Sequence, residues 1–318
     1  MTAQIATVRY SLAEWSDAIN EIFVPMDMSG AGDSFSVTVR TRGLNDIRIL
    51  DVTSTAHRAV RQAQHVARDD LRYFCITLQL EGSSTIAQDG VESILEPGDF
   101  AIYDSTRPFE RRFAEGFRSL TLRFPHHMLS LPPHSLSRLT ATRLAADEGL
   151  GLVVSPYLAE VARNLDQLVG WNGVLVAHTA IDLVSAALAE KLALAGEATQ
   201  GDHAEAFLAA CDYIRQNLGD PGLNPETVAA AGFISVRLLH KIFHAERTTV
   251  SHWIRERRLE QCRRQLSDPH EVDKSVGEIA ASWGIHDAAH FSRLFRTAFG
   301  MSPREYRRTQ LESLESGV

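Results

Sequence analysis

The side chains best suited to chemistry in this sequence are basic or hydroxyl-bearing and occur in two short stretches of its last third. Each set lies on the polar side of an expected amphipathic helix. The first set is Arg237, His240 and Lys241, and the second is Ser292, Arg293 and Arg296. Such groups donate hydrogen bonds to phosphates and to the edges of bases. Both stretches therefore predict contacts with a nucleic acid.

The first stretch contains two helix starts separated by a turn. Asn224 can cap a helix that has Pro225 at its first position. The chain then turns after Gly232, and Ser235 can cap a second helix that ends at His244. This pattern predicts a helix-turn-helix unit over residues 224–244, whose second helix would enter the major groove of DNA.

The second stretch repeats the pattern. Ser275 and Glu278 have the spacing of a capping box, and Gly284 lies in the expected turn. Asp287 can cap the next helix, which we expect over residues 288–299. The sequence therefore predicts a second helix-turn-helix unit over residues 275–299.

A single amphipathic helix is expected over residues 250–266, between the two units. Its apolar side contains Trp253, Leu259 and Cys262. Its arginines are expected on the outside: Arg255, Arg257, Arg258, Arg263 and Arg264. Such a helix would hold the two units at a fixed separation, and units about 34 Å apart reach successive major-groove segments.

The first half of the chain has a different periodicity. Apolar residues alternate along several segments between residues 35 and 124, and Asp89-Gly90 marks a tight hairpin. These features predict a small antiparallel β-barrel. Two helices follow over residues 155–195, with a Ser155-Pro156 start and apolar residues three and four apart, including Leu165 and Leu188. Their apolar side could cover the barrel or form a dimer seam.

The fold class is therefore α+β, with two domains. We expect a barrel domain with its helical hairpin over residues 1–196, a linker over 197–203 and an all-α domain over 204–310.

The net charge of −8 is distributed unevenly. Residues 1–203 carry 17 Lys and Arg against 25 Asp and Glu, whereas residues 204–310 carry 15 against 13. DNA binding depends on the local charge, so the second domain can bind phosphates. The sequence has no charged and apolar N-terminal leader and no uninterrupted apolar run of roughly 18 residues, so we expect a cytoplasmic protein without a membrane segment.

Catalytic and metal sites are not indicated. The three cysteines are far apart, the histidines lack the His-x-His spacing of metal barrels, and no nucleophile elbow or glycine-rich phosphate loop occurs. We therefore expect no cofactor, no metal and no enzymatic activity.

Three segments of the second domain resemble the DNA-binding domain of the AraC/XylS family of bacterial transcription regulators. They are Ser235–Phe243 (SVRLLHKIF), Arg257–Arg264 (RRLEQCRR) and Phe291–Arg307 (FSRLFRTAFGMSPREYR). The glycine common in the first turn of the family stands here as Gly232, beside Phe233. The resemblance implies that residues on the two second helices contact DNA: Ser235, Arg237, His240, Lys241, Ala288, Ala289, Ser292, Arg293 and Arg296.

The first domain resembles the cupin-like sensor domain of the same family, through Leu95–Asp104, Arg107–Phe109 and Phe117–Phe124. The resemblance implies a small-molecule effector in the barrel, a homodimer and, for an activator, contact with RNA polymerase. An arginine inside the barrel would suit an organic acid. The candidate effector-binding residues are Arg40, Arg72, Tyr103 and Arg107, with Arg118 as a further arginine whose direction depends on strand register.

These observations predict a sequence-specific transcription regulator, an activator, controlled by an effector in its N-terminal barrel. One alternative is a DNA-binding regulator whose barrel serves only as a dimerisation scaffold. A cupin enzyme is the weaker alternative, because the metal ligands are missing.

Overall fold

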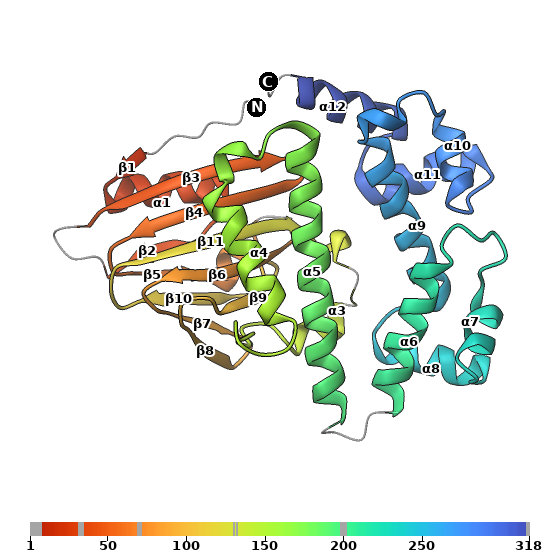
Figure 1. Ribbon diagram of the computed structural model, residues 1–318, viewed down its shortest axis with the longest axis horizontal. Helices are drawn as coiled ribbons and strands as arrows, with labels where there is room; N and C mark the ends of the chain where they lie inside the picture. The colour runs from red at the N-terminus through yellow and green to blue at the C-terminus, as the bar shows by residue number, and fades with distance from the viewer. Residues whose placement is uncertain are drawn as a thin grey trace. The chain divides into compact units, whose positions relative to one another are not determined.

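The computed structural model describes residues 8–30, 35–68, 72–129, 131, 133–197 and 202–315. The chain forms two compact units (Figure 1). Unit 1 comprises Met1–Leu129 and Leu136–Leu188, and unit 2 comprises Ser130–Ser135 and Ala189–Val318. The division falls inside helix α5 (Gly170–Glu197), earlier than the domain boundary expected after residue 196. Residues 198–201 of the expected linker lie outside the described residues.

Unit 1 is built on two antiparallel sheets that enclose an apolar core. Sheet A has the order β1-β3-β4-β11-β6-β9, and sheet B has the order β2-β5-β10-β7-β8. The strands of sheet A are β1 (Val8–Tyr10), β3 (Val37–Leu44), β4 (Ile47–Ser54), β6 (Tyr73–Glu81), β9 (Phe100–Asp104) and β11 (Phe117–Pro125). Those of sheet B are β2 (Asp27–Ser29), β5 (His57–Arg61), β7 (Ser84–Gln88), β8 (Val91–Leu95) and β10 (Phe109–Phe113).

The predicted α+β class is confirmed, but the sheets do not close into a barrel. In the part of the chain that is described, no ladder joins sheet A to sheet B. The hairpin expected at Asp89-Gly90 connects β7 to β8, and both residues have positive φ angles, 52° and 81°. A two-residue turn of this kind matches the twist of paired strands.

Helix α1 (Leu12–Ile22) packs its apolar side, including Trp15 and Ile19, against the core between the sheets. Ser11 and Glu14 cap its start, with the Glu14 Oε2 accepting a hydrogen bond of 2.8 Å from the Ser11 amide. Helix α2 (Ala63–Val66) is a single turn after β5.

The expected helical hairpin is present on sheet A and consists of α4 (Gly151–Arg163), the short 3-10 turn η2 (Leu165–Gln167) and α5. Helix α4 begins at Gly151 and contains Pro156 in its interior, so the expected start at Ser155 is wrong. Leu165 and Leu188 are each 0% exposed. A dimer seam through these two residues is therefore also wrong, because their side chains are buried within the chain.

Helix α5 is long and apolar enough to span a membrane, judged by length and composition, over Gly170–Leu194. The sequence criterion of an uninterrupted apolar run did not find this helix, because polar residues such as Asn172, His178 and Asp182 interrupt it. Over half of the window, 56%, is buried inside the chain, as in the core helix of a soluble protein. The helix pair Pro225–Ala231 and Val236–Ala245 passes the same test only as one span broken by a bend of 100°.

Unit 2 is helical in its described part. Its helices are α6 (Asp202–Gln216), α7 (Pro225–Ala231), α8 (Val236–Ala245), α9 (Val250–Leu266), α10 (Val276–Ser282), α11 (Ala288–Phe299) and α12 (Pro303–Glu315). Short helical segments α3 (Pro133–Ser137), η1 (His126–Met128) and η3 (Pro269–Glu271) complete the chain. Two apolar cores form in unit 2, one around α6, α7 and α8 and one around α10, α11 and α12.

Helix α9 belongs to both cores. Val250 and Trp253 pack in the first core, and Leu259 and Leu266 pack in the second. Five arginines of this helix were expected on its outer face, and this prediction is wrong for two of them. Arg257 is 9% exposed and Arg263 is 2% exposed, because α9 is packed on more than one side.

Arg258 connects the loop before α7 to the turn after α10. Its Nε donates to the Leu218 carbonyl at 3.0 Å, its Nη2 to the Asp220 carbonyl at 2.6 Å and its Nη1 to the Gly284 carbonyl at 3.3 Å. These bonds tie the two helix-turn-helix units together beside α9, as the expectation of a fixed separation requires.

Candidate nucleic-acid interface and ligand cavity

The first helix-turn-helix consists of α7 and α8, whose axes differ by 100°. Asn224 Oδ1 accepts a hydrogen bond from the Thr227 amide at 3.0 Å, and Ser235 Oγ accepts one from the Leu238 amide at 3.1 Å. Both predicted caps are confirmed. The outer face of α8 exposes Arg237, His240 and Lys241, and Ser235 is exposed at its start.

The turn of this unit differs from its expected form. Gly232 has an ordinary φ of −85°, whereas Phe233 has a φ of 52° and is 97% exposed. The left-handed position is thus filled by phenylalanine, although this conformation favours glycine. The equivalent turn of the second unit has Gly284 with a φ of 73°.

The second helix-turn-helix consists of α10 and α11. The capping box of Ser275 and Glu278 is confirmed, with bonds of 2.7 Å and 3.2 Å. Asp287 Oδ1 caps α11 by accepting bonds of 2.9 Å from the amides of Ala289 and His290. The hydrogen bond from the His290 amide lowers the pKa of Asp287. Desolvation raises this pKa, and the bond from the Ala289 amide lowers it further.

The predicted DNA-contacting residues of α11 lie on one side of the helix. Ala288, Ala289, Arg293 and Arg296 are exposed, and Ser292 is partly buried. The Ser292 hydroxyl donates to the Ala288 carbonyl at 2.9 Å, which occupies its only hydrogen. Arg296 Nη2 lies 4.0 Å from Glu305 Oε2.

Three cations on these two faces have free donors. Across the described residues, neither Arg237 nor Lys241 nor Arg293 forms an ion pair. Their guanidinium and ammonium groups can therefore bind an external acceptor without breaking an internal contact. Two exposed, capped helices that carry such donors on one rigid unit are suited to bind a polyanion with a regular repeat.

Unit 1 contains a cavity of about 50 Å³ between its sheets. Sheet A contributes Leu50, Val52, Tyr103, Phe117, Ser119 and Thr121, and sheet B contributes Met28, His57, Ala59, Phe109, Arg111 and Phe113. Helix α1 contributes Trp15 and Ile19, and Phe23 and Met26, which follow it, complete the wall. Most of this surface is apolar and aromatic.

Of the four residues proposed for effector binding, Tyr103 lines the cavity. Arg40 lies on the opposite face of sheet A. Its Nη2 is 2.5 Å from Asp51 Oδ2 and 2.5 Å from the Ala162 carbonyl of α4. Arg118 shares Asp51, with bonds of 3.0 Å and 2.9 Å. Arg40 therefore connects the helical hairpin to the sheet, and Arg118 pairs within the sheet. Neither arginine lines the cavity.

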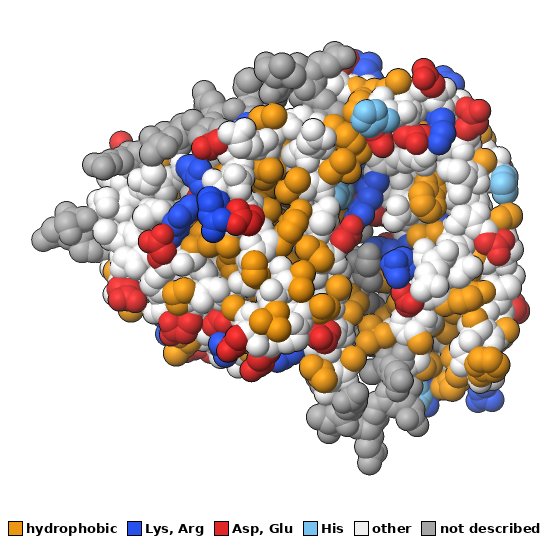
Figure 2. Space-filling view, in the orientation of Figure 1, with side chains coloured by type: hydrophobic (Ala, Val, Ile, Leu, Met, Phe, Trp, Pro, Cys, Tyr) orange, Lys and Arg blue, Asp and Glu red, His pale blue; other side chains and the backbone are white. Residues whose placement is uncertain are grey.

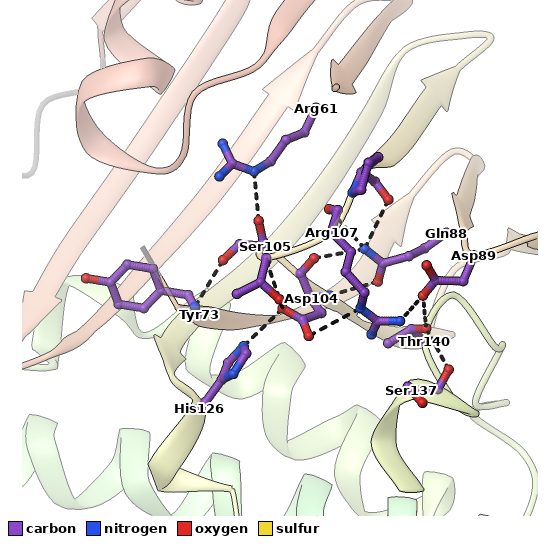
Figure 3. A network of polar contacts seen from close by, with 12 residues as sticks. Arg61, Tyr73, Gln88, Asp89, Asp104, Ser105, Arg107, His126, Ser137 and Thr140 are labelled. Atoms are coloured by element: carbon purple, nitrogen blue, oxygen red, sulfur yellow. Dashed lines mark hydrogen bonds and ion pairs between the residues drawn. The ribbon is translucent and has the colours of Figure 1, made fainter. Parts of the chain in front are cut away.

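Arg107 and Arg72 also lie outside the cavity lining. Arg107 pairs with Asp89, and its Nε lies 3.4 Å from Asp104 Oδ2 (Figure 3). His126 Nε2 lies 3.0 Å from the other oxygen of Asp104. Burial opposes ionisation of Asp104, but the contact with His126 and bonds from Thr106 lower its pKa. Arg72 is exposed.

The arginine that lines the cavity is Arg111, which the sequence analysis missed. It lies on β10 between Phe109 and Phe113, with Glu110 and Arg112 on the other face of the strand. The alternation of Phe, Arg and Phe is visible in the sequence and could have identified it, because residues two apart share a face of a strand.

No group of three His, Cys, Asp or Glu side chains suited to a metal ion occurs among the described residues. His57, the histidine of the cavity, has its Nδ1 3.0 Å from the Thr55 carbonyl and 3.3 Å from Ser54 Oγ. Burial lowers its pKa, although the bond to the Thr55 carbonyl raises it. The His57 ring packs among Phe35, Phe113 and Phe117.

Unit 1 and unit 2 together define a DNA-binding transcription regulator with a sensor-like domain. Residues 15–189 match the AraC-binding-like domain and residues 228–309 match a helix-turn-helix domain. The chain belongs to the AraC family of transcription regulators, which is not a family of enzymes.

Two curated relatives cover most of the chain. The transcriptional activator NphR of Rhodococcus sp is 30% identical over 299 residues, which is 93% of this chain and 88% of NphR. An uncharacterised protein from the nit 5′ region of Bacillus sp. (strain OxB-1) is 31% identical over 241 residues, 71% of this chain and 90% of that protein.

Among solved structures, the AraC-like transcriptional activator CuxR has the same fold, with a TM-score of 0.50 and 22% identity over 78% of this chain and 89% of CuxR. This likeness concerns the fold, that is, the order and arrangement of helices and strands.

Proposed function

We propose that this protein is a sequence-specific transcription activator that responds to a small-molecule effector bound between the sheets of unit 1. The observation that carries the proposal is the pair of exposed basic helices, α8 and α11, held on one unit by α9 and Arg258. The cavity in the AraC-binding-like domain supports the effector response. The printed name of NphR, a transcriptional activator, favours activation over repression.

We propose that α8 and α11 enter successive major-groove segments on one face of DNA. Arg237 and Arg293 are the expected base readers, because a guanidinium can bind guanine O6 and N7 through two hydrogen bonds. The methyl groups of Ala288 and Ala289 can contact only a thymine methyl. His240, Lys241 and Ser292 are expected to project into the groove beside them, and Ser235 and Arg296 are further expected DNA contacts.

Selection from random double-stranded DNA with the full chain tests this assignment. Two conserved clusters about 10 base pairs apart are expected, one for each recognition helix. Arg293→Ala should weaken binding to the selected site by roughly 1–3 kcal/mol and relax the preference at one position. An equal loss on every sequence, with a salt dependence shallower by about 1, would identify Arg293 as a phosphate contact instead.

The effector response is tested by thermal unfolding of the full chain with small metabolites. A ligand that binds only the folded protein raises its melting temperature. If no compound does so, unit 1 acts as a scaffold only.

We also propose that the protein acts in the cytoplasm as a homodimer and contacts RNA polymerase as an activator. Hydrophobic side chains gather over the α4–α5 hairpin (Figure 2), where Leu152, Val153 and Leu175 are exposed by 61%, 53% and 46%. Changing Leu152 and Val153 to Glu should yield a monomer in light scattering, whereas a persistent dimer would place the interface elsewhere.

A further inference from the structure

Arg111 is a buried cation with unused hydrogen-bond donors. Arg111 is 7% exposed, and the Nε and Nη2 atoms of its guanidinium have no hydrogen-bond partner. The guanidinium interacts with the Tyr103 hydroxyl and lies over the Phe113 ring, 4.7 Å from its centre. Burial lowers the pKa of Arg111, but an arginine remains charged in proteins. A buried charge without an acceptor is costly, so an anion at this position would stabilise the folded chain.

The two free donors form one edge of the guanidinium. Nε and Nη2 point in the same direction and can bind both oxygens of a carboxylate. The same edge is used elsewhere in unit 1. Arg58 donates from Nε and Nη2 to the two oxygens of Glu110, at 2.7 Å and 2.8 Å. Arg111 pairs with Ala59 at the adjoining register position of the same two strands, and its side chain is part of the cavity wall.

The other residues of the cavity wall indicate which chemical groups the anionic ligand needs besides its charge. Trp15 Nε1 is a second buried donor without a partner, and Trp15 also lines the cavity. The described lining residues include no Asp or Glu. His57, Tyr103, Ser119 and Thr121 are further polar residues of the wall. The rest is apolar or aromatic, with stacked rings of Phe113 and Phe117 3.6 Å apart. These features favour a single negative charge attached to an apolar body.

From these contacts we propose that the cavity binds a small monocarboxylate with an apolar, preferably planar body, and that Arg111 is the residue that binds its carboxylate. The proposal rests on the effector function proposed above and specifies the chemical class of the effector. The Trp15 indole donates a further hydrogen bond to the ligand.

The size of the cavity adds a consequence for α1. A volume of about 50 Å³ holds a few water-sized groups, such as a carboxylate. Pockets that enclose entire ligands measure roughly 300–1,000 Å³. The apolar body of the ligand therefore enters by displacing part of the wall. Helix α1 and the residues that follow it are the part of the wall outside the sheet ladders, so Trp15, Ile19 and Phe23 are expected to move first.

The experiment compares acids with their uncharged amides on the full chain. The probes are benzoate, phenylacetate and hexanoate, each paired with the corresponding amide, and the readouts are thermal unfolding and titration calorimetry. At least one acid is expected to raise the melting temperature. It should bind roughly 10- to 100-fold more tightly than its amide, because the amide cannot form the charged hydrogen bonds that the carboxylate forms with Arg111.

Arg111→Met should abolish the difference between acid and amide, because it keeps an apolar side chain of similar length. Arg112→Met is the matched control on the opposite face of the same strand and should leave binding unchanged. Arg111→Lys keeps the charge but loses the paired donors, so it should bind the acid with intermediate affinity. This variant decides the question if Arg111→Met does not fold.

Each outcome has a defined meaning. Acid binding that survives in Arg111→Met overturns the role of Arg111. Amides that bind as well as acids overturn the carboxylate but leave an effector in the cavity. If none of the six probes binds, the proposed class is wrong. The effector function itself fails only if a broader set of neutral metabolites also leaves the melting temperature unchanged.

Discussion

Both units contain buried arginines, and two of them, Arg263 in unit 2 and Arg111 in unit 1, are bound differently. In unit 2, Arg263 on α9 is 2% exposed, and its Nε and Nη2 donate to Glu260 at 2.8 Å and 3.0 Å. Its Nη1 donates to the Tyr306 hydroxyl of α12 at 2.8 Å. In unit 1, Arg111 lines a cavity, and the same two atoms, Nε and Nη2, are buried without a hydrogen-bond partner.

The difference separates two uses of one side chain. Arg263 is satisfied within the fold and connects α12 to α9, so it has a structural role. Arg111 leaves two donors without an acceptor in the fold, and under the proposal above a ligand supplies that acceptor. Each unit also has other buried polar atoms without a partner, such as Trp15 Nε1 in unit 1 and Thr248 Oγ1 in unit 2, so the contrast concerns these two arginines and not the units as a whole.

The largest expected effect is on stability when the satisfied arginine is removed. Arg263→Met removes two hydrogen bonds from the buried Glu260 carboxylate, which keeps its contact with Arg264 at 3.2 Å. The free energy of unfolding of unit 2 should fall by about 3–5 kcal/mol. Urea unfolding of the full chain, followed by circular dichroism, measures the loss.

Arg111→Met is the control for that prediction. It removes a buried charge without leaving a partner, so the stability of unit 1 should stay unchanged or rise. Equal losses for the two variants would break the comparison, because Arg111 would then also be a structural residue.

A smaller loss is expected for Arg258, which is half-buried and bound to three neutral carbonyls. Arg258→Met should cost about 1.5–3 kcal/mol. It should also weaken binding to a two-cluster DNA site more than to a site with one cluster. The reason is that the hydrogen bonds from Arg258 to both helix-turn-helix units are lost. If the two sites lose affinity equally, Arg258 does not set the relative position of the units.

The smallest effect is expected at the first turn, where Phe233 is exposed in a left-handed conformation. Phe233→Gly removes a strain of about 1 kcal/mol but increases the freedom of the unfolded chain. The net gain in stability should stay below about 1 kcal/mol, measured by the same urea unfolding. Gly284→Ala at the equivalent turn is the opposite control. A Cβ there would lie 2.7 Å from Arg258 Nη2, so this variant should lose stability.

The sequence predicted unit 2 better than unit 1 for a physical reason. Caps such as Asn224, Ser235, Ser275 and Asp287 act over three or four residues, so their pattern is local and readable. The burial of Arg263 was missed because it depends on Tyr306, which is distant in sequence.

The candidate site of unit 1 depended on strand register and on which face of a sheet the hairpin covers. Arg40 was misplaced because α4 packs on the outer face of sheet A, and no local pattern shows this. Register is set by pairing between distant strands. Arg111, by contrast, was readable from its two flanking phenylalanines.

The central claim is that a ligand bound between the sheets of unit 1 controls DNA binding by unit 2. The most direct test measures the affinity of the full chain for its selected DNA while benzoate, phenylacetate or hexanoate is added. The account predicts that an acid which binds wild type also changes its Kd for DNA by roughly 5- to 150-fold. The Kd of Arg111→Met should not respond. By linkage, DNA must change the affinity for the acid by the same factor. An acid that binds at Arg111 and leaves the Kd for DNA unchanged would contradict the claim.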